Sequence, residues 1–252
     1  MGLSICMAAS VGTWGDASFG GSVGAWGVAG YGGFLDSPQA ELQGVDVRHV
    51  FTTQHAFAAL LADDSIVTWG KEMNTSGNSD QWNDDDYSYA HNFGADSSGS
   101  DLTNVRTVYG TTHSFAALKK DNTVVTWGNY TKIPLVFASE ADLANVSAVY
   151  ATAFSFAALK FDGTVVTWGD AREGGNSSGM NLTSVQTIAA TSHTFYALRL
   201  DGTVVYWGRA GSGELDGKAR TIYTNNWAFA TLLQNGTVSV WGVRTAHSNR
   251  AC

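Results

Sequence analysis

Histidines at one recurring position are the first residues of this chain whose type and spacing could do chemistry. Each stands just before an apolar run rich in alanine and leucine, as His55, His113 and His193. Three imidazoles bind a metal ion only if their nitrogens come within about 2.1 Å of one centre, whereas equivalent residues of packed repeats lie at least one repeat width apart. Two further copies of the position carry Phe154 and Trp227, so it accepts an apolar ring. We therefore assign the histidines a structural role and expect neither a metal nor a cofactor.

An acidic segment, residues 71–100, is the second candidate for chemistry. It holds six carboxylates and one lysine, together with aromatic residues that the repeat does not require. Aromatic side chains among charges are typical anchors of protein interfaces. A solvated insertion without a role is the alternative, and a calcium site is disfavoured because the EF-hand spacing is missing. The candidate partner-binding residues are Trp82, Asp84, Asp85, Asp86, Tyr87 and Tyr89.

Tryptophan-glycine pairs are the most regular feature of the chain. The seven pairs begin at Trp14, Trp26, Trp69, Trp127, Trp168, Trp207 and Trp241. Exposed tryptophans could form a platform for carbohydrate, but one ligand site in every repeat would be unusual. We expect instead that tryptophan fills the space between repeats, while glycine lets the chain turn away. The structural set is Trp69, Trp127, Trp168, Trp207 and Trp241.

The elements that carry these residues are short strands. Residues 145–169 contain three apolar runs of strand length, separated by turn signals. The turn between the second and third runs is Asp162-Gly163, a signal for a type I′ hairpin. At the same place Asp63-Asp64 and Asp121-Asn122 occur, and both residue types tolerate a left-handed backbone. Each repeat is thus predicted to be a three-stranded meander, and residues 133–137 could add a fourth strand.

Packing of these meanders against one another predicts the fold class. A single meander cannot bury both of its faces, so neighbouring repeats must cover each other. Radial packing, as in a β-propeller, does this and leaves only short edges. We predict one all-β propeller domain over 1–252, with an N-terminal hairpin at 10–27 and five full repeats closed by the tryptophans from Trp69 onward. Six blade positions are expected, and an incomplete seven-bladed ring is the alternative.

The repeat also carries a family resemblance. Residues 112–128 and 192–208 resemble the repeat of the regulator of chromosome condensation family, with its lead-in histidine, Ala-Leu strand, Asp-Gly turn and closing Trp-Gly. The resemblance covers roughly residues 43–242, although the family's glycine before the histidine survives only as Gly110. It implies a propeller, usually seven-bladed. It implies little about activity, because this fold hosts many functions.

Composition narrows the classes of function. The chain has 252 residues, 44% hydrophobic and 14% charged, and a net charge of −8. Without a basic run, attraction to nucleic acid or to an anionic membrane is not expected. Residues 1–10 lack a basic start and a sustained apolar stretch, and no membrane-spanning segment is evident, so an intracellular, cytoplasmic protein is expected. Cys6 and Cys252 stand near the two ends, and we expect ring closure to bring them close, most often as free thiols.

These observations favour a binding function over an enzymatic one. Nucleophile elbows, phosphate-binding loops and zinc-protease motifs are all missing from the sequence. The leading hypothesis is a non-enzymatic module that presents loops between blades to a protein partner. The alternative is a guanine-nucleotide exchange factor for a small GTPase. An extracellular inhibitor or lectin would require a secretion signal, which the sequence does not show.

Overall fold

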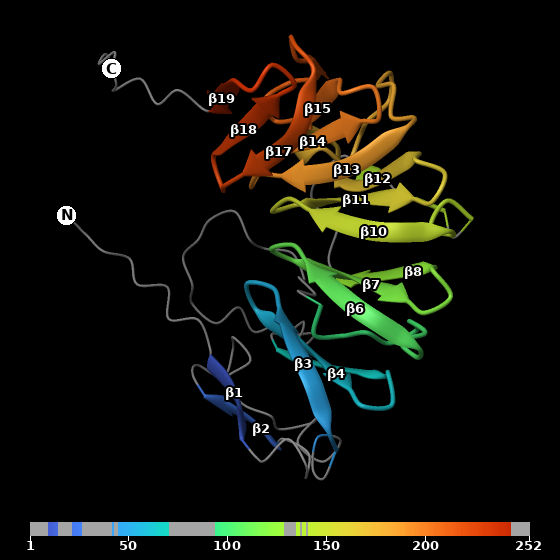
Figure 1. The fold of residues 1–252 in the computed structure, drawn as a ribbon. Helices are drawn as coiled ribbons and strands as arrows, with labels where there is room; N and C mark the ends of the chain where they lie inside the picture. The colour runs from blue at the N-terminus through green and yellow to red at the C-terminus, as the bar shows by residue number, and fades with distance from the viewer. Residues whose placement is uncertain are drawn as a thin grey trace, which may run out of the picture. The chain divides into compact units, whose positions relative to one another are not determined.

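The structure is a computed structural model, and it describes part of the chain. The described residues are 10–14, 22–26, 42, 45–70, 94–128, 135–136, 138–139 and 141–242. The chain forms two compact units, Met1–Lys132 and Ile133–Cys252, called unit 1 and unit 2 below (Figure 1). The prediction of a single domain over 1–252 stays a prediction.

In the described part of unit 1 the strands form one hairpin and two three-stranded sheets. The sheet orders are β1-β2, β3-β4-β5 and β6-β7-β8, and all neighbours are antiparallel. Their bounds are β1 Ser10–Trp14, β2 Ser22–Trp26, β3 Val47–Thr52, β4 Ala56–Leu61, β5 Ile66–Gly70, β6 Val105–Gly110, β7 Ser114–Lys119 and β8 Val124–Gly128. The hairpin and the three-stranded meanders lie where the sequence predicts them.

The described part of unit 2 contains three sheets of the same kind, two of which have a fourth strand. The orders are β10-β11-β12-β9, β13-β14-β15-β16 and β17-β18-β19 (Figure 1). The bounds are β9 Leu135–Val136, β10 Val146–Ala151, β11 Ser155–Lys160, β12 Val165–Asp170, β13 Val185–Ala190, β14 Thr194–Arg199, β15 Val204–Gly208, β16 Gly213–Glu214, β17 Ala219–Thr224, β18 Ala228–Leu233 and β19 Val238–Gly242. A single 3-10 turn, Ala171–Glu173, follows β12. Because β9 pairs with the outer edge of β12, the predicted fourth strand at 133–137 is confirmed.

The hairpin turns differ from the predicted type I′. Between β11 and β12 the amide of Gly163 donates to the carbonyl of Lys160, and the amide of Lys160 donates to the carbonyl of Thr164. Only Gly163 has a positive φ, of 79°, and Asp162 does not. This is a three-residue loop, a type I turn followed by a left-handed residue. Asp162 keeps a negative φ while its carboxylate accepts bonds from the amide and hydroxyl of Thr164.

The same turn recurs where the sequence has no glycine. Asp64 and Asn122 occupy the left-handed position, with φ of 69° and 67°. The expectation that aspartate and asparagine can replace glycine there is confirmed, because their short polar side chains tolerate this conformation best. The loop length, and therefore the register of the hairpin, is the same in these repeats.

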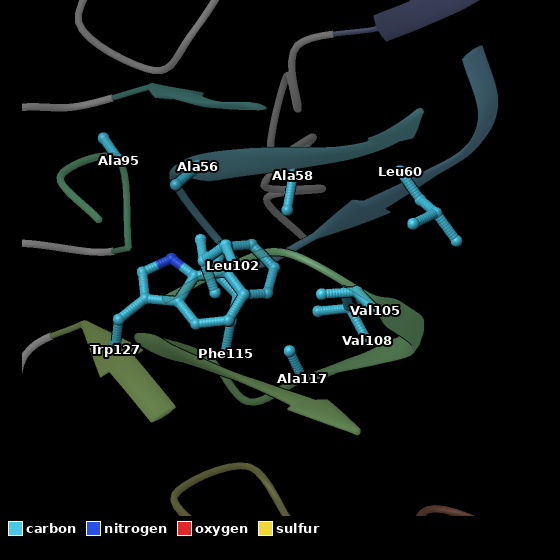
Figure 2. Close-up of a cluster of buried hydrophobic side chains, with 10 residues drawn as sticks. All are labelled: Ala56, Ala58, Leu60, Ala95, Leu102, Val105, Val108, Phe115, Ala117 and Trp127. Carbon is cyan, nitrogen blue, oxygen red and sulfur yellow. The ribbon is translucent and has the colours of Figure 1, made fainter. Parts of the chain in front are cut away.

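The central strand of a sheet, hereafter a blade, alternates its side chains between the two faces, and in β14 both faces are buried. In β14, Phe195 and Ala197 pack with the preceding blade, while Tyr196 and Leu198 pack with the following one. Figure 2 shows the corresponding core of unit 1, where Phe115 and Trp127 lie side by side opposite Ala56 and Ala58. Neighbouring blades within a unit therefore share one continuous apolar layer.

The Trp-Gly pair sits at the end of the last strand of a blade. Each tryptophan stacks on the phenylalanine opposite it in the central strand, with ring centroids 5.2–5.3 Å apart in the five repeats. Trp207 is 1% exposed, and the tryptophans at 69, 127 and 168 are also buried. Gly208 has a φ of 128°, and a Cβ there would lie 2.5 Å from the carbonyl oxygen of His193. The tight approach explains why glycine follows the tryptophan.

Candidate functional site

The space between two successive blades of unit 2 is closed by the segment that connects them. We call the space between blade β10–β12 and blade β13–β15 the filled gap. Its connector, residues 170–184, passes over the stacked rings of Phe195 and Trp207. The indole of Trp207 donates to the carbonyl of Gly174 at 3.0 Å. Gly174 has a φ of 103°, and a Cβ there would lie 2.7 Å from the Phe195 ring. Glycine is therefore required where the connector crosses the phenylalanine.

Unit 1 closes its own gap in the same way. Between blades β3–β5 and β6–β8, the indole of Trp127 donates to the carbonyl of Gly94 at 3.0 Å. The hydroxyl of Thr68 donates to the carbonyl of Ala95 at 2.7 Å, as Thr167 does to Gly175 at 3.0 Å in the filled gap. Two connectors of different total length thus end in one common structure.

This common structure revises the limits of the acidic segment. Residues 71–100 are predicted as one insertion, but Gly94 caps Trp127, and Ala95 is buried in the core that Figure 2 shows. The described residues 94–100 therefore belong to the packing between blades. The candidate residues Trp82 to Tyr89, and Cys6 and Cys252 as well, lie outside the described residues, so their proposed roles stay predictions.

The space between the last two blades of unit 2 is different, and we call it the open gap. A groove of about 720 Å³ lies there, between blade β13–β15 and blade β17–β19. Its lining consists of Thr191, His193, Thr194, Tyr196, Tyr206, Arg209, Ala210, Leu215, Asn226, Trp227, Phe229 and Trp241. Trp241, the counterpart of the buried Trp207, is only half-buried, and Trp227 is 65% exposed. The open gap is therefore the candidate binding site.

Residues of the lead-in position, which directly precedes the central strand of each blade, form a row along unit 2. The ring of His193 lies 6.3 Å from that of Phe154 and 6.1 Å from that of Trp227, measured between centroids. The expectation that such residues are a full repeat width apart is wrong for these neighbours, because side chains of this size meet across the gap. The expected acceptance of an apolar ring agrees with the stacked geometry of Phe154 and His193.

His193 also has a polar partner that the sequence did not indicate. Its Nδ1 lies 2.8 Å from a carboxylate oxygen of Glu173, which belongs to the 3-10 turn of the filled gap. The other oxygen of Glu173 lies 3.6 Å from the guanidinium of Arg209, at the rim of the open gap. Glu173 is buried and Arg209 is largely exposed. This cluster ties the connector of the filled gap to the wall of the open gap.

Hydrogen bonds lower the pKa of the aspartates in the hairpin turns of the blades. The amide of Thr203 donates to Asp201, and this hydrogen bond with that of the Thr203 hydroxyl lowers the pKa of Asp201 to about 2. An ammonium group, that of Lys119, lies 2.6 Å from Asp101 and is the main reason that the pKa of Asp101 is also about 2.

Inside the groove, burial raises the pKa of Tyr196 above 10.0, so its phenol is neutral at physiological pH.

Within the described residues, His, Cys, Asp and Glu side chains do not gather in any group of three or more able to hold a metal ion. The imidazole contacts of His193 found there are with Glu173 and the two neighbouring rings. The observed geometry gives His193 a positioning role between connector and blade.

Comparisons with known proteins agree with a propeller. No family model matches the chain, and no curated protein matches it by sequence. The ectodomain of the Physcomitrella patens receptor kinase CR4 is similar in structure, with 14% identity over 94% of this chain and 64% of that one, at a TM-score of 0.50. That likeness, together with the antiparallel blades, shows an all-β propeller-repeat fold.

Two further structures are similar at lower scores. The Arabidopsis thaliana ACR4 ectodomain has 12% identity over 88% of this chain and 72% of that one, with a TM-score of 0.47. Saccharomyces cerevisiae Prp20p has 16% identity over 87% of this chain and 67% of that one, with a TM-score of 0.46. No helix among the described residues has the length and apolar character to cross a bilayer.

Proposed function

We propose that this protein is a non-enzymatic protein-interaction module and that the open gap is a binding site for its partner. The observation that carries the proposal is the groove at which Trp227 lies exposed and Trp241 half-buried, while Trp207, the counterpart of Trp241 in the filled gap, is buried. Tryptophan and tyrosine in a concave, water-accessible site are the residues that most often dominate binding energy at protein interfaces.

The groove combines apolar and polar walls in a way that suits a protein chain. Tyr196 and Phe229 stack at 4.0 Å to form its floor, while Thr191, Thr194 and Asn226 add polar groups at its sides. A volume of about 720 Å³ is in the range of sites that take a few residues of a chain or a small molecule.

The acidic segment supplies a second proposed contact. Trp82, Tyr87 and Tyr89 with their flanking aspartates remain the predicted anchors there, and they precede the part that packs between blades. A deletion that tests them must stop before Gly94, because Gly94 caps Trp127.

The test compares Trp227→Ala with Phe161→Ala, a matched control whose phenylalanine is equally exposed, at 65%, on a hairpin turn of the same unit. Partners captured by the unmodified protein are identified, purified and titrated against both variants. We expect Trp227→Ala to weaken binding by at least about tenfold, as for an interface hot spot, and Phe161→Ala to leave it unchanged. Equal binding by both variants would remove the groove from the interface.

The alternative activity, nucleotide exchange, is tested separately. The unmodified protein is added to a panel of small GTPases loaded with a fluorescent guanine nucleotide. Our proposal predicts the same release rate with and without the protein. Acceleration that depends on Trp227 would assign the groove to an exchange factor and contradict the proposed function.

A further inference from the structure

The connector of the filled gap is held at four of its backbone carbonyls by side chains of the flanking blades. Four side chains of the two flanking blades donate to four successive regions of it. The bonds are Ser155 Oγ to Asp170 at 2.9 Å, Thr152 Oγ1 to Glu173 at 3.3 Å, Trp207 Nε1 to Gly174 at 3.0 Å and Thr167 Oγ1 to Gly175 at 3.0 Å. Such bonds select a backbone path and leave most side chains of the bound segment unspecified.

At the four equivalent register positions the open gap also has residues with a hydrogen-bond donor, one of which, Tyr206, is larger than its counterpart and has its hydroxyl beside Gly213. Strand register equates Trp241, opposite Phe229, with Trp207, opposite Phe195. The same register places Thr191, Thr194 and Tyr206 where the filled gap has Thr152, Ser155 and Thr167. All four residues line the groove. Among the described residues, none accepts a hydrogen bond from the Trp241 indole.

The open gap has a shorter connector, which does not cross the gap. Counted from the Trp-Gly pair to the next opening strand, the filled gap has 15 connecting residues, 170–184, and the open gap has 10, 209–218. The shorter segment forms β16 against β15 instead of crossing the Phe229 and Trp241 rings. The groove is therefore the place that a longer connector would occupy.

We propose that the open gap binds a glycine-containing loop of a partner protein, which takes the path that the connector follows in the filled gap. This inference rests on the proposed function and names the chemistry of the partner. A carbonyl of the loop accepts from Trp241 Nε1, and glycine crosses the ring of Phe229, because Gly174 has to be glycine above Phe195.

The positive charge at the rim of the groove indicates that the bound loop also contains an acidic residue. Arg209 and His193 are the basic residues of the lining, which also holds Tyr196 and Tyr206 and includes no aspartate or glutamate. Arg209 has a side chain that is 66% exposed, and Glu173 engages only its inner side. A carboxylate of the loop can therefore pair with the exposed part of the Arg209 side chain. The chain's own connector meets the whole description, since residues 169–179 read GDAREGGNSSG.

The test uses a synthetic peptide of residues 169–179 and the full-length protein. Affinities are measured by fluorescence anisotropy of the labelled peptide, and the NMR signal of the Trp241 indole N–H, assigned with Trp241→Phe, reports the site in the unmodified protein. We expect saturable binding, weakened about three- to tenfold by Trp241→Phe, which keeps the ring and removes the donor. A peptide with Gly174→Val should bind at least about tenfold more weakly. Equal binding in these comparisons, or no binding at millimolar peptide, would overturn the inference.

A second variant provides an independent check. Replacing residues 209–218 with residues 170–184 should fill the groove, abolish peptide binding and raise the melting temperature. Undiminished binding by this graft would overturn the inference, as would self-association that the graft removes, because the occupant would then be a second copy of this chain. If the peptide binds as expected while no captured partner depends on Trp227, the loop site stands and the proposed function fails.

Discussion

The filled gap and the open gap of unit 2 share one strand pattern and differ in the length of the connector and in the residues that face it. Both have a tryptophan stacked on a phenylalanine at 5.2–5.3 Å, a lead-in aromatic ring and hydroxyl groups on the facing blade. In the filled gap the indole has a carbonyl acceptor and Trp207 is 1% exposed, whereas Trp241 is half-buried beside a groove. The connector is 15 residues long in the filled gap and 10 in the open gap, and the strand residues that face it change from Ala157 and Thr167 to Tyr196 and Tyr206.

The largest effect that separates the two gaps is expected from deleting the tryptophan side chains. Trp207→Ala should lower the free energy of unfolding by about 3–5 kcal/mol, because a large buried ring leaves a cavity. Trp241→Ala should cost about half as much or less, since its ring is already partly in water. Urea unfolding of both variants measures this. Equal losses would mean that the two gaps are equally packed.

Glycine in the connector provides a sharper contrast. Gly174→Ala forces a methyl group to within 2.7 Å of the Phe195 ring at a φ of 103°. Gly211→Ala is the matched control, because Gly211 has a φ of 96° but no atom within 4 Å of its added Cβ. We expect Gly174→Ala to reduce the free energy of unfolding by about 1–3 kcal/mol more than the control does. Equal effects would show that backbone strain alone acts at Gly174.

Exchange of a lead-in ring tests the link between the gaps. His193→Phe keeps an aromatic ring, as Phe154 does one blade earlier, but leaves the buried Glu173 with Arg209 alone. The free energy of unfolding should fall by about 1–2 kcal/mol, the effect of an unsatisfied buried polar group. Trp227→Phe, at the same position beside the open gap, should change it by less than about 0.5 kcal/mol. An unchanged free energy of unfolding in His193→Phe would show that the contact between His193 and Glu173 does not contribute to stability.

Low pH is expected to change the difference between the two gaps least, because the turns that flank both gaps have the same hydrogen bonds. Asp201 has a pKa lowered to about 2, and that of Asp162 is also lowered, by bonds from Thr164. A lowered pKa in the folded state means that stability is complete above about pH 4 and is lost as the pH falls toward 2. Melting temperatures should decline over this range, and less steeply in Asp201→Asn. Asn235 already forms the same turn with Thr237 without titrating. A melting temperature independent of pH would contradict the assigned bonds.

The strands and the tryptophans that pack between the blades could be predicted from the sequence because they repeat. Five copies of a strand-turn-strand pattern closed by Trp-Gly fix the strands, and burial of Trp168 and Trp207 follows from their apolar repeats. The predicted turn type was wrong because aspartate before glycine occurs in loops of two lengths, and the three-residue loop found here also lets the Asp162 carboxylate accept from the amide of Thr164.

The groove could not be predicted, because it arises where the connector is shorter than the connector of the filled gap. Only a comparison of 94–105 with 174–185, which share a glycine, a Ser-Ser-Gly and a Leu-Thr, would have shown that the connector before Ala219 is too short. Glu173 and Arg209 lie in connectors whose paths the strand pattern does not specify, so their contact with His193 needed the fold.

The most direct test of this account is hydrogen exchange at the tryptophan indoles of the unmodified protein. The N–H of Trp207 donates to a buried carbonyl at 3.0 Å, as that of Trp127 does, whereas Trp241 lines the groove. With signals assigned by single Trp→Phe variants, we expect slow exchange at Trp127 and Trp207, limited by opening of the blades, and fast exchange at Trp241. Protection of Trp241 equal to that of Trp207 would show that the last gap is closed and would contradict the account.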